Sequence, residues 1–116
     1  MKLSLVVALV SDDKTTDVID AARAGGATGD TIISGARGEG LRPEKTFLGL
    51  DLTARRDLIL FLVAESRARD ILERIAEAGG MDREHGDGVA FQLTIADAVG
   101  LSTQLPRLME ELEEAI

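Results

Sequence analysis

The hydrophobic pattern of this chain occurs twice. In each copy a strongly apolar segment leads into an amphipathic segment of helical period, a Gly-Gly pair follows, and a further strand-like segment completes the unit. The first copy covers residues 2–10, 12–24, 25–26 and 31–35, and the second covers residues 57–64, 66–78, 79–80 and 89–96. Two βαβ units in 116 residues predict an α+β fold, a ferredoxin-like βαββαβ sandwich with two helices on one face of a four-stranded antiparallel sheet.

Two of the predicted strands are apolar on both faces. Residues 2–10 and 57–64 consist almost entirely of aliphatic side chains, which is typical of strands in the middle of a sheet. Residues 89–95 alternate instead, and this period predicts a strand with one better-buried face. The apolar side of that strand carries Val89, Phe91, Leu93 and Ile95.

The two predicted helices have start and stop signals. Ser11 and Ser66 are N-cap candidates, and Asp12 and Asp13 are interpreted as charges that favour a helix start. The Gly-Gly pairs allow a left-handed residue at the C-terminal end of each helix. A last amphipathic helix is predicted over residues 104–116. The stripes expected to face inward are Val18, Ile19, Ala21 and Ala22 in the first helix and Ile71, Leu72, Ile75 and Ala76 in the second.

Two helices can cover only one face of a small sheet, so the apolar residues of the other face need a cover. A large exposed apolar patch is rare on a soluble monomer. We therefore predict an obligate oligomer in which the sheets of several copies pack together. The competing explanation is a C-terminal helix that folds back over the sheet.

The segment between the two copies, residues 36–53, is longer than a hairpin connection requires. Glycines and a proline interrupt it, yet it carries apolar residues that a plain linker does not need. These are Phe47, Leu48, Leu50 and Leu52. We interpret the segment as a loop that covers a ligand or contacts a partner, and a surface linker without a task is the alternative.

Composition narrows the classes of function. The chain has a formal net charge of −8, 3% aromatic residues and no cysteine. The charge argues against a nucleic-acid partner, and the scarcity of aromatic rings removes the stacking surface of a single-strand RNA binder. Disulfides and thiolate metal sites are excluded. Because neither a signal-peptide pattern nor a membrane-spanning apolar run is found, we expect one cytoplasmic domain over residues 1–116.

Two glycine-containing segments are candidate ligand loops. Gly86-Asp87-Gly88 precedes the last strand, and backbone N–H groups around such glycines can form an anion nest, although a plain turn has the same sequence. Residues 26–31 lead into the second strand and would place the Thr31 hydroxyl beside a ligand. The alternative for this second segment is a helix stop followed by a turn.

No pattern indicates catalysis or a metal site. His85 is the only histidine and has no cysteine partners, so a solvated loop histidine is the favoured interpretation. Ser34, Ser66 and Ser102 lack a neighbouring base, and the spacing yields no pair of general acid and base. The sequence therefore predicts a protein without enzymatic activity, with neither catalytic nor metal-ligating residues.

Taken together, these segments resemble the PII signalling family, the nitrogen regulatory protein P-II-like proteins. The resemblance extends to about Leu101 and rests on Lys2-Leu3, residues 26–31, the long middle segment and Gly86-Asp87-Gly88 ahead of Phe91. It implies a homotrimer whose sheets pack against one another, with ATP, ADP or AMP as effector in clefts between subunits. No cofactor is required, although Mg²⁺ is compatible with such a site. Residues 36–53 would correspond to the T-loop, which docks onto a transporter or an enzyme.

Carried over by position, the resemblance also assigns residues to these tasks. The nucleotide-binding positions are Thr31, Gly35, Gly86, Asp87, Gly88, Val89 and Ala90. The partner-binding positions of the T-loop segment, residues 36–53, are Arg37, Arg42, Lys45, Phe47 and Leu48.

The chain departs from the family pattern at charged positions. Val89 and Ala90 stand where nitrogen-regulatory members have a lysine, and residues 100–103 stand where they have an arginine pair. Lost charge-assisted contacts to phosphate are worth roughly 1.5–3 kcal/mol each. The chain has no tyrosine, which excludes uridylylation, and residues 39–41 offer no clear match to the glutamine that helps to hold magnesium and 2-oxoglutarate. The resemblance is therefore to a divergent member.

Three functions follow as expectations. The first is a regulator that binds an adenine nucleotide at subunit interfaces and controls a partner protein, such as a membrane transporter or a metabolic enzyme, through the T-loop segment. The second is a trimer of the same fold that has lost nucleotide binding and acts as a scaffold or senses another small anion such as bicarbonate. The third, a small acylphosphatase-like enzyme, is disfavoured because residues 10–13 are acidic where that chemistry needs an arginine.

Overall fold

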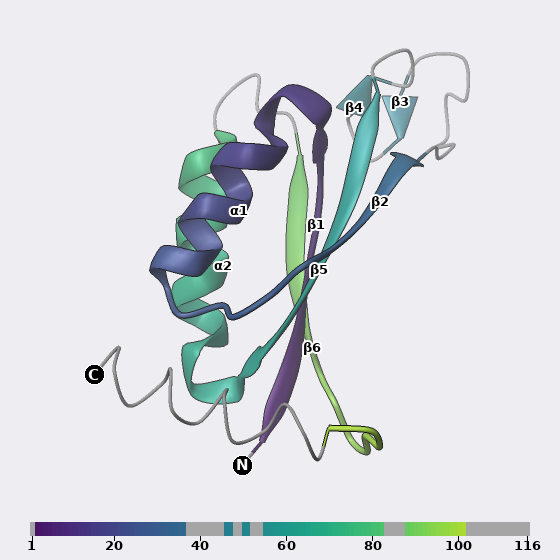
Figure 1. Ribbon diagram of the computed structural model, residues 1–116. Coiled ribbons are helices and arrows are strands. Elements are labelled where there is room, and N and C mark those ends of the chain that lie inside the picture. Colours follow the sequence, from purple (N-terminus) through teal and green to yellow (C-terminus); the bar gives the residue numbers. More distant parts are fainter. Residues whose placement is uncertain (1, 37–45, 48–49, 52–54, 83–87, 102–116) are drawn as a thin grey trace.

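The structure is a computed structural model that describes residues 2–36, 46–47, 50–51, 55–82 and 88–101. Two helices lie on one face of a four-stranded sheet, as the sequence pattern predicts (Figure 1). In chain order the elements are β1 (Leu3–Ser11), a short 3-10 turn η1 (Asp12–Lys14), α1 (Thr15–Ala24), β2 (Thr31–Ala36), β3 (Thr46–Phe47), β4 (Leu50–Asp51), β5 (Arg56–Ala64), α2 (Glu65–Gly79) and β6 (Val89–Thr94).

The four long strands form an antiparallel sheet in the order β2-β5-β1-β6. The two strands predicted to be central, β1 and β5, are central, and this explains why both of their faces are apolar. The strands β2 and β6 form the two edges. Between β2 and β5 the chain also contains a separate two-stranded pair, β3 with β4, which the sequence analysis did not predict.

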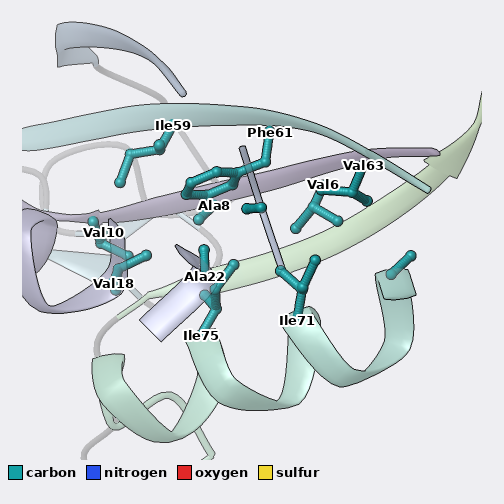
Figure 2. Packing of buried hydrophobic residues seen from close by; sticks show 12 residues of the cluster. Val6, Ala8, Val10, Val18, Ala22, Ile59, Phe61, Val63, Ile71 and Ile75 are labelled. Atoms are coloured by element: carbon teal, nitrogen blue, oxygen red, sulfur yellow. The ribbon is translucent and has the colours of Figure 1, made fainter. Parts of the chain in front are cut away.

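The core lies between the sheet and the helices. Alternate residues of β1 and β5 point to the same side of the sheet, and their register places Val6 opposite Phe61 and Ala8 opposite Ile59. Figure 2 shows these side chains pointing into the layer where Ile71 and others of the helices meet them. The fully buried members of this layer are Val6, Ala8, Val10, Val18, Ala22, Ile59, Phe61, Ile71 and Ile75. One phenylalanine among aliphatic side chains agrees with the scarcity of aromatic residues.

The helix starts differ from the predictions. The helix α2 begins at Glu65 rather than Ser66, with Ala64 at the N-cap position and no side-chain cap hydrogen bond. Ser11 precedes the η1 turn, and its hydroxyl donates a hydrogen bond to the Asp13 carboxylate instead of capping a backbone N–H. Ser66 as an N-cap is therefore wrong, because tertiary packing of the apolar stripe, more than the cap, decides where α2 begins.

The face of the sheet opposite the helices carries a continuous set of apolar side chains. It will be called the open face, and among the described residues no helix covers it. Its members, taken from the strand registers, are Leu5, Val7, Leu9, Ile33, Leu58, Leu60, Leu62, Val89, Phe91 and Leu93. Phe91 is 44% and Leu93 51% exposed, so the apolar side of β6 is not the buried one within a single chain.

The predicted helix over residues 104–116 lies outside the described residues.

Candidate functional site

A hollow of about 280 Å³ lies between α2 and the start of β6. Residues of α2 line one wall and residues 88–90 line the other, and the family resemblance assigns residues 88–90 to nucleotide binding. The α2 side contributes Arg69, Leu72, Glu73 and Ala76, and the turn after the helix contributes Met81 and Asp82. Leu72 and Ala76, predicted to face inward, are only half-buried because they border this hollow.

The local fold of the hollow depends on two glycines. Gly80 ends α2 in the left-handed conformation (φ 63°), and the next residue, Met81, donates its N–H to the Ala76 carbonyl at 2.9 Å. Gly88 has φ 139°, and a Cβ there would lie 3.2 Å from the Leu9 carbonyl oxygen and 3.4 Å from Met81 side-chain carbons. The chain therefore passes close over Met81 and β1 at a position where only glycine fits without strain.

The charges at the hollow are mostly acidic. Arg69 Nε lies 3.0 Å from Glu73 Oε1, one helical turn away, so its guanidinium already has an anionic partner. Asp82 adds an exposed carboxylate. Among the described lining residues, Arg69 is the only cation, and the described part of the hollow has a formal charge of −1 from one arginine, one glutamate and one aspartate.

The other predicted ligand residues lie on the opposite edge of the sheet. Thr31 begins β2 and is exposed, directly after Asp30, whose carboxylate accepts a hydrogen bond from Arg23 at 2.8 Å. This ion pair joins the end of α1 to the start of β2. Gly35 has φ 72° and lies where the register between β2 and β5 shifts, so a bulge bends the strand as it enters the T-loop segment.

A polar cluster occupies the end of β1 and the start of β5. Thr15 Oγ1 donates a hydrogen bond to Asp57 Oδ2 at 2.6 Å, and the Asp12 N–H donates to the Arg55 carbonyl at 3.1 Å. The Ser11 hydroxyl lowers the pKa of Asp13 below its usual value, with smaller effects from burial, the backbone, Lys14 and Arg56.

Arg56 is 4% exposed in this cluster, opposite Ser11 in β1. Sequence reasoning interpreted Asp12 and Asp13 only as helix-start charges and missed the cluster. The one available signal was the polar pair Arg56-Asp57 directly ahead of an apolar strand.

The structure brings only part of the predicted site together. Gly88, Val89 and Ala90 border the hollow beside α2, whereas Thr31 and Gly35 lie at the far edge of the sheet. Gly86 and Asp87 lie outside the described residues, as do His85, Arg37, Arg42, Lys45 and Leu48. Phe47 lies in β3, paired with Leu50 of β4. The prediction did not include the lining residues Arg69, Glu73, Met81 and Asp82, because polar residues on an exposed helix face and residues of the turn after the helix give no signal of their own.

A match to a protein-family model shows which family the chain belongs to. The family model of nitrogen regulatory protein P-II matches residues 3–105. The chain belongs to the nitrogen regulatory protein P-II family. The resemblance drawn from the sequence is thereby confirmed, and so is the PII-like form of the ferredoxin-type fold.

Solved structures of PII-like proteins have the same architecture. A PII-like signalling protein from Thermus thermophilus is 25% identical, with 82% of this chain and 88% of that chain covered and a TM-score of 0.60. CPII from Thiomonas intermedia, determined with ADP, AMP and acetate bound, is 17% identical, with 83% and 90% covered and a TM-score of 0.61. At 17% identity the likeness to CPII shows the fold alone. No curated protein matches the chain.

The described part of this PII family member lacks two kinds of feature. Neither α1 nor α2 is long and apolar enough to cross a membrane. Within residues 2–36, 55–82 and 88–101, no three histidine or acidic side chains gather where they could hold a metal ion.

Proposed function

We propose that the protein is a cytoplasmic, trimeric PII-type regulator that binds an adenine nucleotide between protomers. The bound nucleotide changes the conformation of the T-loop segment, which controls a partner protein such as a transporter or a metabolic enzyme. Ordering of a loop by a ligand is an established type of switch. The PII family, to which the chain belongs, is a family of regulatory proteins and not of enzymes.

The observation that carries the proposal is the open face. Leu5, Val7, Leu60, Phe91 and Leu93 belong to a sheet surface that no described helix covers. Apolar surface of this extent is stabilised by contact with another apolar surface, at about 25 cal/mol for each Å² removed from water. A second and third copy offer the same surface, and closed symmetry satisfies all three.

The sheet order supports a nucleotide site between copies. Thr31 and Gly35 lie on edge strand β2, and residues 88–90 lie at edge strand β6, with β5 and β1 between them. One protomer therefore cannot bring both sets of residues to the same ligand. Two neighbouring copies can do so by placing the β2 edge of one beside the β6 edge of the next. The nucleotide complex of CPII, which has the same fold, supports adenine nucleotides as the ligand class.

Sedimentation equilibrium and calorimetry test this proposal. At micromolar protein we expect three times the monomer mass, and we expect saturable binding of at least one of AMP, ADP and ATP at up to millimolar concentration. A well-folded monomer would contradict the oligomer. A trimer that binds none of the three nucleotides would contradict the sensor.

The charge of the described lining favours one second candidate. Because Arg69 is paired with Glu73 and Asp82 is acidic, these residues offer phosphate no unpaired cation. A trimer that has lost nucleotide binding, and that acts as a scaffold or senses another small anion such as bicarbonate, fits this feature. Protein purified without bound nucleotide, indifferent to titration yet able to capture its partner, would support this candidate over the first.

A further inference from the structure

We propose that the hollow beside Gly88 selects adenine nucleotides by charge, with a nucleoside monophosphate bound more tightly than a triphosphate, and that Glu73 is a specificity-determining residue. This inference rests on the proposed nucleotide site.

Glu73 borders the same hollow as residues 88–90, which the family resemblance assigns to nucleotide binding. A phosphate chain bound at those residues would lie across the hollow from α2. The Glu73 carboxylate and the Asp82 carboxylate are then the described anions facing it.

The guanidinium of Arg69 is paired with the Glu73 carboxylate. A free guanidinium at this place would attract phosphate and offset the acidic groups. Its Nε instead lies 3.0 Å from Glu73 Oε1, and both side chains belong to one helix face, four residues apart. Glu73 therefore acts twice: it adds a negative charge to the hollow and it engages the cation that would bind a phosphate.

The charge of the ligand itself determines how strongly the acidic residues of the hollow repel it. Each additional phosphate brings more negative charge into the hollow, so the repulsion from Glu73 and Asp82 increases from AMP to ADP to ATP. Both side chains of the Arg69–Glu73 pair are mostly exposed, at 75% and 62%, so solvent and salt screen the effect without removing it. A divalent cation on the phosphates reduces the repulsion for the longer chains, because it cancels part of their charge.

Calorimetric titration of the trimer with AMP and with ATP, in Mg²⁺-free buffer of low ionic strength, tests the inference. The wild-type protein should bind AMP more tightly than ATP. In Glu73→Gln one negative charge disappears and Arg69 becomes free, so ATP affinity should rise more than AMP affinity. With a separation of about 7 Å and a dielectric constant near that of water, one charge acting on the roughly two additional charges of ATP changes the ratio of the two dissociation constants about sevenfold.

The matched control is Asp70→Asn on the same helix. Asp70 accepts a hydrogen bond from Arg74 Nε at 2.8 Å, also four residues away, and neither residue borders the hollow. The control makes the same change in net charge and frees an arginine in the same way, but away from the hollow, so it should change the ratio of the AMP and ATP dissociation constants much less than Glu73→Gln does.

The outcomes separate the two claims. Equal shifts in Glu73→Gln and Asp70→Asn would overturn the role of Glu73, because net charge alone would then explain the change. Wild-type protein that binds Mg²⁺-free ATP as tightly as AMP would overturn charge selection while leaving the nucleotide site intact. Failure of wild type and both variants to bind any nucleotide would overturn the proposed function, and charge selection with it.

Discussion

Single residues at this site are constrained by backbone geometry as much as by chemistry. Gly88 illustrates this, because its φ of 139° and its closeness to the Leu9 carbonyl would strain any other residue at this position. The sequence suggested Gly88 as part of an anion nest, whereas the structure shows a packing reason as well. Gly88 therefore borders the hollow and also allows the chain to pass close to β1 where β6 begins.

Replacement of Gly88 by alanine should therefore destabilise the fold. The strained backbone and the 3.2 Å contact with a backbone oxygen should cost about 1–3 kcal/mol of the free energy of unfolding, measured by urea denaturation. Gly29→Ala is the control, because a Cβ at Gly29 meets no atom within 4 Å. Equal changes in the free energy of unfolding of the two variants would show that alanine at position 88 causes no backbone strain.

The Ser11–Asp13 pair leads to a prediction about pH. The Ser11 hydroxyl donates to the Asp13 carboxylate and lowers its pKa, so the carboxylate form is favoured in the folded state. The stability that this bond contributes is present above the usual pKa of an aspartate and is lost as the pH falls through the lowered pKa. In Ser11→Ala the pKa of Asp13, followed by NMR titration, should rise towards its usual value.

Ser66→Ala is the control for this titration, because it removes the same hydroxyl group from an exposed residue at the start of α2, a different element from the η1 turn that carries Asp13. An unchanged pKa of Asp13 in Ser11→Ala would mean that the backbone and the neighbouring cations Lys14 and Arg56, and not the hydroxyl, lower this pKa.

At the scale of elements, the sequence predicted those features that depend on periodicity and failed where tertiary contacts decide. The central positions of β1 and β5 followed from their apolar character on both faces, and β6 followed from its alternation. The start of α2 did not follow, because Ser66 looked like a cap while Ala64 holds that position. The buried side of β6 did not follow either, since alternation reveals two faces without saying which one the helices cover.

The candidate site was predictable to the extent that its residues belong to glycine segments. Gly88, Val89 and Ala90 were recognised, and they border a hollow. The opposing wall was not recognised, because Arg69 and Glu73 look like an ordinary ion pair on an exposed helix face. Only the packing of α2 beside the start of β6 gives this pair a hollow to face.

At the scale of the whole molecule, the proposed assembly and the proposed ligand binding would depend on the same surface. The residues proposed for the nucleotide are divided between the β2 and β6 edges, so the proposed site would be incomplete in a single chain. The open face lies between those edges, and its contact with other copies is what would bring a β2 edge to a β6 edge. Loss of the trimer should therefore abolish nucleotide binding even when the hollow beside Gly88 is unchanged.

Leu93→Asp tests this dependence. Leu93 is 51% exposed on the open face of β6, so the monomer should tolerate the substitution, whereas a carboxylate without a partner in an apolar interface costs several kcal/mol. We expect a folded monomer at micromolar concentration by analytical ultracentrifugation and circular dichroism, with nucleotide affinity reduced at least tenfold in calorimetry.

Gln92→Asp is the control, since Gln92 lies one residue away, is exposed and points to the helix side. A Leu93→Asp protein that remains trimeric would place the interface elsewhere, and a monomer that binds nucleotide as wild type does would place the whole site within one chain.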